Sequence, residues 1–472
     1  MMEGRLSSAT GVMQGRLHGR DAAFHGISTD SRTVQARELF FALQGPRFDG
    51  SEFVPQAAAA GAAGAVVAGP PGTDLPTIEV ADTRRALGRV AAAWRRQMPA
   101  TVIALTGSNG KTTCKEMIAS CLALAAPTLA TRGNLNNDVG VPLMLAELAP
   151  DHRYAVLELG ANHHGEIAWL ASLVEPVIAM ITNAGPAHLE GFGSIRGVAE
   201  AKGEILAGQP RPEWTVLNAD DPYFGYWRTL AAGTEVVSFG MHAEADVRAV
   251  NVESTESGTA FTLLAGSNRG FRSTKTPVRP FPEIEVSLPL AGRHNAQLAA
   301  AAAAAVLAAG LDAETIRRGL EAVRPVAGRI KALPGIHGCR VFDDSYNANP
   351  ASVTAAGQFV AARPGESWLV LGDMGELGPE SANLHRQVGE ALAAAGVDRL
   401  FATGPLSRHA VEAFGGDGTW AESVDALEDL LVRQLGDRGA QGVNVLVKGS
   451  RAMRMERVVR ALALPANDEP GA

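Results

Sequence analysis

Short apolar runs alternate with helical patterns along most of this chain. In the middle of the sequence the runs are TVIAL, YAVLEL, VIAMI, WTVLN and EVVSF, and Gly, Asn or Asp follows most of them. Short apolar runs bounded by turn residues are typical of buried strands, and strands that alternate with helices indicate a mostly parallel α/β sheet. Because open parallel sheets bind ligands beyond the carboxyl ends of their strands, the polar residues after these runs are candidates for a site.

The alternation occurs in three blocks, which predict three domains at residues 1–98, 99–327 and 328–472. The first block has short strand patterns and ends in a helical pattern before Pro99. The central block contains the runs above, a more β-rich insert and an alanine-rich helical pattern that Gly310 ends. The last block repeats the rhythm in CRVFDDSY, SWLVLGDMG, RLFATG and VNVLVKGS. A length of 472 residues, at about 150 residues per domain, gives the same number of domains.

Composition and charge exclude several classes of protein. Hydrophobic residues make up 46% of the chain and charged residues 19%, which is ordinary for a globular protein in water. The net charge of -8 argues against a general nucleic-acid binder, which needs an excess of Lys and Arg. No stretch approaches the roughly 18–20 uninterrupted apolar residues of a membrane span, and the first residues lack the apolar core of an export signal. Cys114, Cys121 and Cys339 have neither metal-site nor disulfide spacing, so we expect a cytoplasmic protein in which the first two thiols are buried.

The segment TVIALTGSNGKTTCKEMI has the composition of a phosphate-binding loop between a strand and a helix. Gly107 and Gly110 allow backbone conformations that bring several N–H groups toward one point, at which the N-terminus of the following helix is also aimed. Lys111 adds a mobile positive charge, and Thr112 stands where a P-loop hydroxyl meets Mg²⁺. Only two residues separate the two glycines, whereas the usual motif has the spacing GxxxxGK. The strand before and the helix after still favour a nucleoside triphosphate over the alternative, a glycine turn with a surface lysine.

Three further residues are candidates for a metal site. Glu158 ends an apolar run, and a carboxylate buried there needs a cation, for which Mg²⁺ beside phosphates is suitable. His188 follows the next apolar run by a few residues, and Lys202 lies in a helical pattern. Each residue alone also fits a structural interpretation: an exposed strand end for Glu158, a satisfied structural histidine for His188 and a solvated helix lysine for Lys202.

Ten longer motifs occur along the chain, and they favour the functional interpretation of these residues over the structural one. In order they are STDSRTVQARELFFALQGPRFDG, TGSNGKTTCKEM, GNLNNDVGVP, ELGANHHGEI, AHLEGFGS, AKGEI, LPLAGRHN, DDSYNANPAS, LGDMGELG and LVKGSR. The set closely resembles the Mur ligases of peptidoglycan synthesis, over nearly the whole chain from about Ile27 to Leu462. GNLNNDVGVP, ELGANHHGEI and DDSYNANP favour the member of that family whose substrates are UDP-N-acetylmuramoyl-tripeptide and D-alanyl-D-alanine.

The resemblance implies a fold and a reaction. The fold is α/β in three domains: an N-terminal UDP-substrate-binding domain, a central P-loop ATPase-like domain with a mostly parallel sheet, and a C-terminal Rossmann-like domain. The reaction is an ATP-dependent amide ligation in which ATP phosphorylates the terminal carboxylate of the tripeptide and the amine of the dipeptide attacks the acyl phosphate. The products are UDP-N-acetylmuramoyl-pentapeptide, ADP and phosphate. The resemblance also implies ATP and Mg²⁺ as cofactors, with two metal sites, in a monomer.

The resemblance also implies roles for individual residues. It makes Lys111, Glu158, His188 and Lys202 the catalytic set. One metal is expected on Thr112 and Glu158, and a second on His188 and on Lys202, the latter converted to a negatively charged carbamate. The residues expected to hold ATP are Thr106, Gly107, Ser108, Asn109, Gly110, Lys111, Thr112, Thr113, His294, Asn295, Arg329 and Asp344. The residues expected to hold the other substrates are Ser28, Asp30, Ser31, Arg32, Arg47, Phe48, Asp49, Asn134, Asn136, Asn137, Asn347 and Lys448.

Two alternatives remain open from the sequence. Another Mur ligase, or a ligase similar to folylpolyglutamate synthetase, would share the ATP site but differ in its substrate loops, and the RFDG and GNLNND elements argue against it. A nucleotide switch or scaffold without ligase activity would have no use for a second metal site. The sequence does not distinguish meso-diaminopimelate from lysine as the third residue of the peptide.

Overall fold

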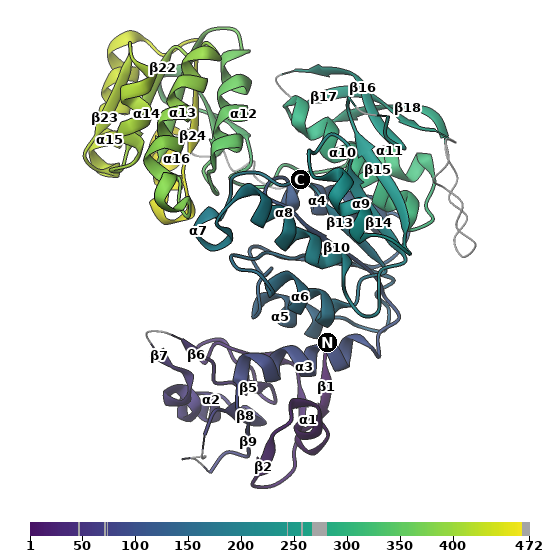
Figure 1. Ribbon diagram of the computed structural model, residues 1–472. Coiled ribbons are helices and arrows are strands. Elements are labelled where there is room, and N and C mark those ends of the chain that lie inside the picture. Colours follow the sequence, from purple (N-terminus) through teal and green to yellow (C-terminus); the bar gives the residue numbers. More distant parts are fainter. Residues whose placement is uncertain are drawn as a thin grey trace, which may run out of the picture.

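The computed structural model describes residues 1–45, 48–69, 72, 74–242, 244–255, 258–266 and 281–464. It contains three α/β bodies, each built around one larger sheet (Figure 1). The first body lies at the bottom of Figure 1, the central body above it, and the third, coloured green to yellow, at the upper left. The predicted α/β fold of three domains is confirmed, and the domain boundaries themselves stay predictions.

The first body has a five-stranded sheet that is parallel except at one edge. Its order in space is β2 (Arg16–His18), β9 (Thr77–Glu79), β8 (Gly64–Val67), β5 (Leu39–Phe41) and β4 (Ile27–Ser28). Only β2 runs antiparallel to its neighbour within this sheet. Two short antiparallel pairs are β1 (Glu3–Arg5) with β3 (Ala23–His25), and β6 (Gln44–Gly45) with β7 (Phe48–Asp49). The helices are α1 (Leu6–Met13), α2 (Val54–Ala59) and α3 (Thr83–Arg95).

The central body has a nine-stranded sheet that is mostly parallel, as predicted. Its order is β11 (Thr128–Ala130), β12 (Tyr154–Glu158), β10 (Thr101–Thr106), β13 (Ile178–Ile181), β14 (Trp214–Asn218), β15 (Glu235–Gly240), β16 (Val247–Ser254), β17 (Thr259–Ala265) and β18 (Phe281–Leu288). The strand β17 is antiparallel to both of its neighbours, β16 and β18, and the other neighbouring strands in this sheet are parallel. The helices are α4 (Lys111–Ala123), α5 (Gly140–Ala146), α6 (Glu166–Val174), α7 (Leu189–Phe192), α8 (Ile195–Gly203), α9 (Phe224–Leu230), α10 (Arg293–Ala308) and α11 (Ala313–Glu321).

Small side chains let the helices on one face of this sheet pack closely. The run of alanines in α10 is fully buried in the same cluster as α4 and the strands. A Cβ added to Gly319 of α11 would lie 2.4 Å from Cα of Cys121 in α4, so these helices touch at their backbones. Cys114 and Cys121 are both free and buried there, which confirms the prediction for the two thiols.

The opposite face of the central sheet carries the first body. Leu87 of α3 belongs to the same buried hydrophobic cluster as Leu145 of α5 and Leu170 of α6. The backbone N–H of Met2 donates to the carbonyl of Ala146 at 2.7 Å, which adds a polar contact between the two bodies. A shared apolar core therefore fixes where the start of α3 meets the central body.

The third body has a six-stranded sheet. Its order is β19 (Lys331–Pro334), β20 (Arg340–Asp344), β24 (Val443–Lys448), β21 (Glu366–Gly372), β22 (Arg399–Thr403) and β23 (Gly418–Ala421). All neighbours are parallel except β19 and β20. The helices are α12 (Pro350–Ala361), α13 (Ser381–Ala394), α14 (Ser407–Phe414), α15 (Val424–Arg438) and α16 (Glu456–Leu462). Across the described part of the chain, no helix has both the length and the apolar character to cross a membrane.

Candidate functional site

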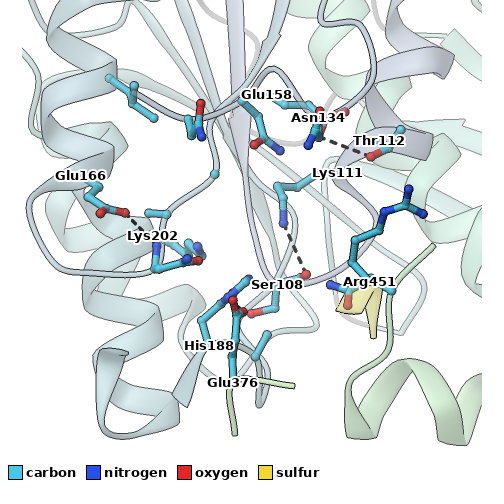
Figure 2. Close-up of a pocket in the computed structure, with 18 of the residues that line it drawn as sticks. Ser108, Lys111, Thr112, Asn134, Glu158, Glu166, His188, Lys202, Glu376 and Arg451 are labelled. Carbon is cyan, nitrogen blue, oxygen red and sulfur yellow. Dashed lines mark hydrogen bonds and ion pairs between the residues drawn. The ribbon is translucent and has the colours of Figure 1, made fainter. Parts of the chain in front are cut away.

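A cavity of about 820 Å³ is lined by residues of all three bodies. The first body contributes the start of α3, the central body contributes the phosphate loop, and the third contributes the loops after β20, β21 and β24. Figure 2 labels side chains from the central and third bodies around it: Ser108, Lys111, Thr112, Asn134, Glu158, Glu166, His188, Lys202, Glu376 and Arg451. The fold thus brings segments that are far apart in the sequence to one site.

The end of strand β13 holds the phosphate loop in place. The backbone N–H of Asn109 donates to the side-chain oxygen of Asn183 at 2.9 Å, and Oγ1 of Thr182 donates to the carbonyl of Asn109 at 2.7 Å. Gly107 has a φ of +150°, and a Cβ added there would lie 1.9 Å from Oγ1 of Thr182, so only glycine fits. The N–H groups of residues 111–113, in the first turn of α4, have no acceptor within the helix. Free N–H groups at a helix N-terminus are suited to bind an anion.

Lys111 lies within this loop without a carboxylate partner. Its Nζ donates to the carbonyl oxygens of Gly107 at 2.5 Å and Ser108 at 3.4 Å. Loss of hydration lowers the pKa of Lys111 to about 8, although the charge of Glu158 acts in the opposite direction. A cation held against carbonyl oxygens of its own loop can exchange them for the stronger acceptors of a bound phosphate.

Glu158 is buried at the end of β12, with 2% of its surface exposed, so an exposed strand end is ruled out. Its backbone N–H donates to Oγ1 of Thr131 at 2.9 Å, and its Oε2 accepts from Oγ1 of Thr112 at 3.3 Å. Its Oε1 is buried and has no hydrogen-bond partner among the residues that the structure describes. A buried carboxylate with one unpaired oxygen is costly, and it fits a hard cation such as Mg²⁺.

Lys202 lies at the end of α8 and is 1% exposed, so it is not a solvated helix lysine. Its Nζ lies 5.1 Å from the centroid of the Phe192 ring, and within the described ranges it forms no hydrogen bond or ion pair. Burial lowers the pKa of Lys202 to about 7, the charge of Lys111 lowers it further, and Glu204 and Glu166 oppose the shift. The uncharged amine is therefore more accessible near neutral pH than in an exposed lysine.

His188 precedes α7 and faces a residue of the third body. Its Nδ1 forms an ion pair with Oε2 of Glu376, which Figure 2 shows beside it. This interaction holds the pKa of Glu376 below its usual value. The His188 ring packs edge-on against Phe192 with 6.4 Å between centroids, and the same Phe192 ring lies against Lys202. Phe192 therefore brings His188 and Lys202 to one part of the cavity.

A second cavity of about 240 Å³ shares Asn109, Gly110 and Arg329 with the first. It is also lined by residues predicted to contact ATP or substrate: Thr113, His294, Asn295, Asp344 and Lys448. In contrast to Lys202, the buried Lys448 is paired, because its Nζ donates to Oδ2 of Asp344 at 2.5 Å and to the carbonyl of Asn347 at 3.0 Å. The second cavity therefore adjoins the phosphate loop.

The predicted substrate residues fall into two groups. Four of them line the large cavity: Asn134, Asn136, Asn137 and Asn347. The first-body group lines neither of the two cavities: Ser28, Asp30, Ser31, Arg32, Phe48 and Asp49. Arg47 lies outside the described residues. Among the predicted ATP residues, Thr106 also lines neither cavity and donates through Oγ1 to the carbonyl of Leu159 at 2.8 Å, which supports the end of β10.

Several cavity residues were not predicted from the sequence. They include Arg84, Arg85, Asp138, His164, Trp169, Tyr346, Glu376 and Arg451. Five of them lie within the motifs GNLNNDVGVP, ELGANHHGEI, DDSYNANPAS, LGDMGELG and LVKGSR, namely Asp138, His164, Tyr346, Glu376 and Arg451, so the motifs indicated the segments but not the side chains. Arg84 pairs with Asp138 at 3.0 Å, and Arg85 stacks on Trp169 at 4.1 Å; nothing in the local sequence indicates either contact between the first and central bodies.

Comparison with known proteins places all three parts of the chain in one group of enzymes. Residues 23–95 match the family model described as "Mur ligase family, catalytic domain". Residues 105–306 match "Mur ligase middle domain", and residues 328–451 match "Mur ligase, glutamate ligase domain".

Individual relatives are similar along nearly their whole length. The UDP-N-acetylmuramoyl-tripeptide–D-alanyl-D-alanine ligase of Escherichia coli strain K12 is 44% identical over 463 residues, which covers 98% of this chain and 99% of the relative. A crystal structure of MurF from Acinetobacter baumannii has a TM-score of 0.89 at 36% identity, with 98% of each chain covered. MurF ligase from Thermotoga maritima in complex with ADP has a TM-score of 0.80 at 26% identity, with 93% of this chain and 96% of the other covered.

Proposed function

The chain belongs to the Mur ligase family, and from this premise we propose that it joins D-alanyl-D-alanine to UDP-N-acetylmuramoyl-tripeptide, converting ATP to ADP and phosphate. The observation that carries the proposal is a cavity shared by three bodies in which Lys111, Lys202 and Glu158 are left without full polar partners. Identity of 44% along almost the whole chain favours this ligase over the alternatives of a folylpolyglutamate-synthetase-like ligase and a nucleotide switch.

ATP would bind across the two cavities. The N–H groups of residues 111–113 and the Lys111 ammonium would take the phosphates. The nucleoside would lie in the second cavity, against residues from the central and third bodies: His294, Asn295, Arg329 and Asp344. Because this cavity is built from two bodies, ATP binding would favour their docked arrangement.

The donor set fits cations next to these phosphates. Oxygen atoms of Thr112 and Glu158 would hold one Mg²⁺, and the unpaired Oε1 of Glu158 supports this assignment. His188 and Lys202 would hold a second. As an ammonium Lys202 repels a cation, so its part in the site requires that the neutral amine take up carbon dioxide, lose a proton and become a carbamate. Bound Mg²⁺ supplies positive charge for the phosphoryl groups during transfer.

The reaction would then need two displacements. An oxygen of the terminal carboxylate of the tripeptide attacks the γ-phosphorus, the bond to ADP breaks, and an acyl phosphate forms. The amine nitrogen of D-alanyl-D-alanine attacks the acyl carbon, phosphate leaves, and the proton of the amine goes to solvent. The protein's own part is to align the carboxylate, the phosphate and the amine between three bodies and to keep water from the acyl phosphate.

The oligomeric state and the domain boundaries are also part of this proposal. The working unit that we propose is a monomer. The domain boundaries after residues 98 and 327 fall between the three sheets, which end or begin at Glu79, Thr101, Leu288 and Lys331.

The test is an assay of phosphate release and of the mass of the product. The enzyme would receive UDP-muramoyl peptides of different length, with either meso-diaminopimelate or lysine in the tripeptide, and D-alanyl-D-alanine, D-alanine, glutamate or diaminopimelate as acceptor. Phosphate release should require the tripeptide and D-alanyl-D-alanine together, with a product heavier by the dipeptide less one water. Equal rates with glutamate or diaminopimelate on a shorter precursor would assign the chain to a sibling activity instead.

A further inference from the structure

Two loops from different bodies meet beside the large cavity, one after β13 and one after β21. Nδ1 of His188 forms an ion pair with Oε2 of Glu376, and the backbone N–H of Glu190 donates to the carbonyl oxygen of Glu376 at 3.1 Å. A Cβ added to Gly378 would lie 3.4 Å from Cα of Glu190, so the backbones themselves are close. The loops therefore hold each other through one side-chain contact and one backbone hydrogen bond.

The two residues of the ion pair share an uncommon backbone conformation. His188 has a φ of 55° and Glu376 a φ of 61°, and both are in the left-handed region that few residues other than glycine adopt. Such conformations persist where the surrounding structure imposes them, and they concentrate at functional sites. Here the backbone hydrogen bond from Glu190 and the packing of His188 on Phe192 provide that constraint. The fold therefore imposes the orientation in which His188 and Glu376 face each other.

We propose that Glu376 is a positioning residue for His188, so that the second cation site is completed only when the third body is docked on the central body. The proposal rests on the function proposed above, which assigns His188 to that site. A histidine that binds a metal through one ring nitrogen usually has its other nitrogen held by a carboxylate or carbonyl, which fixes the direction of the ring. With Nδ1 held by Glu376, Nε2 is the nitrogen left to bind a cation.

The carboxylate and the histidine of this ion pair come from different bodies, and this has a consequence for the cation site. His188 and Lys202 belong to the central body, but Glu376 follows β21 of the third body. Separation of the two bodies would remove the carboxylate from His188 and leave the imidazole free to turn. Docking of the third body, which also completes the second cavity, would therefore orient a ligand of the cation site in the same event. Glu376 acts through His188 and need not touch the reacting groups.

The test measures cation binding without turnover. Mn²⁺ binding would be counted by electron paramagnetic resonance in the presence of a non-hydrolysable ATP analogue, for the wild type, Glu376→Ala, Glu376→Gln and Glu380→Gln. Glu380 is the matched control, because it is exposed, lies four residues further along the same loop and does not line the cavity. The series would be repeated in a His188→Ala background.

We expect two bound Mn²⁺ in the wild type and a loss of about tenfold in affinity at the weaker site in Glu376→Ala. Glu376→Gln, which keeps an acceptor oxygen, should lose less, and Glu380→Gln should bind as the wild type does. In the His188→Ala background, Glu376→Ala should have no further effect, and the ATP analogue is kept at saturating concentration for every variant.

A second measurement follows the imidazole itself. Nitrogen-15 spectra of the ligand-free protein with labelled histidine should show the His188 proton fixed on Nδ1 in the wild type and distributed over both nitrogens in Glu376→Ala. Unchanged Mn²⁺ affinity in Glu376→Ala, or an equal loss in the presence and absence of His188, would overturn the proposal. A single Mn²⁺ in the wild type would remove the second site and this inference with it, while the ligase activity would still be decided by the product assay.

Discussion

The loop after β4 in the first body and the phosphate loop in the central body are both expected to bind anionic groups, yet their charges are arranged in opposite ways. In the first-body loop the Arg32 side chain donates to both Asp30 oxygens, at 2.9 and 2.7 Å, and the backbone N–H of Arg32 donates to Asp30 as well. These hydrogen bonds lower the pKa of Asp30 to about 2. In the described part of the central body, Lys111 donates hydrogen bonds only to carbonyl oxygens, and Nζ of Lys202 lies over an aromatic ring without a hydrogen bond.

The difference in the pairing of charged groups indicates how each region is preorganised to bind its ligand. The first-body loop is exposed and internally paired, so a ligand there must compete with an existing ion pair and gains little from preorganised charge. In the central region, Lys202 and one oxygen of Glu158 are buried without a polar partner among the described residues, so they are destabilising until a ligand supplies the missing partners. Lys448 shows that this fold pairs a buried lysine elsewhere, through Asp344. Among the described residues, Lys111 has no carboxylate partner and Lys202 has no polar partner, and this is therefore a property of the site rather than of the fold.

The largest effect is expected at the phosphate loop. Lys111→Ala should lower the rate of phosphate release by about 10³-fold, because its charge matters only to bound phosphates and to charge that develops during transfer. The melting temperature should not fall. Lys331→Ala is the matched control, since that lysine is exposed on β19 and should be silent. Near-normal turnover in Lys111→Ala would remove the assignment of the loop.

The next prediction distinguishes a carbamate at Lys202 from an unmodified ammonium group. Lys202→Ala should lose about 10²-fold or more in rate while still binding ATP, since the phosphate loop and Glu158 remain. Acetate or formate should restore part of the rate by placing a carboxylate in the vacated space. Lys202→Arg keeps the charge but cannot form a carbamate, so it should stay inactive. Wild-type rates in Lys202→Arg would show that the second cation site does not depend on this lysine.

A smaller and different effect is expected in the first-body loop. Arg32→Ala should raise the KM for the UDP-muramoyl substrate about tenfold, equivalent to about 1.4 kcal/mol, with little change in kcat or in ATP affinity. The unfolding free energy should stay close to that of the wild type, because the Asp30–Arg32 pair is exposed. Arg20→Ala, at an exposed site of the same body, serves as the control. A fall in kcat with unchanged KM would contradict the division between the two regions.

The smallest effect is a gain in stability. Lys202→Met should stabilise the ligand-free protein by about 1 kcal/mol in buffer without carbon dioxide, because it removes an unpaired buried amine. Burial lowers the pKa of Lys202 from 10.5 to about 7, so the unfolded chain binds the proton more tightly between these values. The difference between variant and wild type should therefore be largest below pH 7 and vanish as the pH approaches 10.5. Lys448→Met, which leaves Asp344 buried and unpaired, should instead destabilise by about 3 kcal/mol, and chemical denaturation measures both.

The local parts of the site could be predicted from the sequence. The strand, loop and helix around Lys111 are contiguous, so their spacing alone indicates a phosphate loop. Glu158 was found because it ends an apolar strand, and the parallel sheet places that end beside the loop. The roles of His188 and Lys202 were predicted only from the family resemblance, since each residue alone also fitted a structural interpretation.

The remaining parts depend on contacts that no local pattern encodes. Asn183 and Thr182 hold the phosphate loop from the neighbouring strand, more than 70 positions along the chain. The order of the central sheet, with β10 between β12 and β13, follows from long-range pairing and was not predicted. Glu376 reaches His188 only because the third body docks on the central one. The sequence predicts three α/β domains and a candidate site, and only the structure shows the contacts between the domains.

The proposed second cation site depends most directly on the state of Lys202, because an unpaired buried lysine is useful at a cation site only after its charge is reversed. The wild type would be incubated with carbon-13 bicarbonate, Mg²⁺ and a non-hydrolysable ATP analogue, and nuclear magnetic resonance would detect a carbamate carbon bound to the protein. We predict one such signal near neutral pH, absent from Lys202→Ala and Lys202→Arg and present in Lys331→Ala. The absence of a signal from the wild type at saturating bicarbonate, or its persistence in Lys202→Arg, would contradict the account.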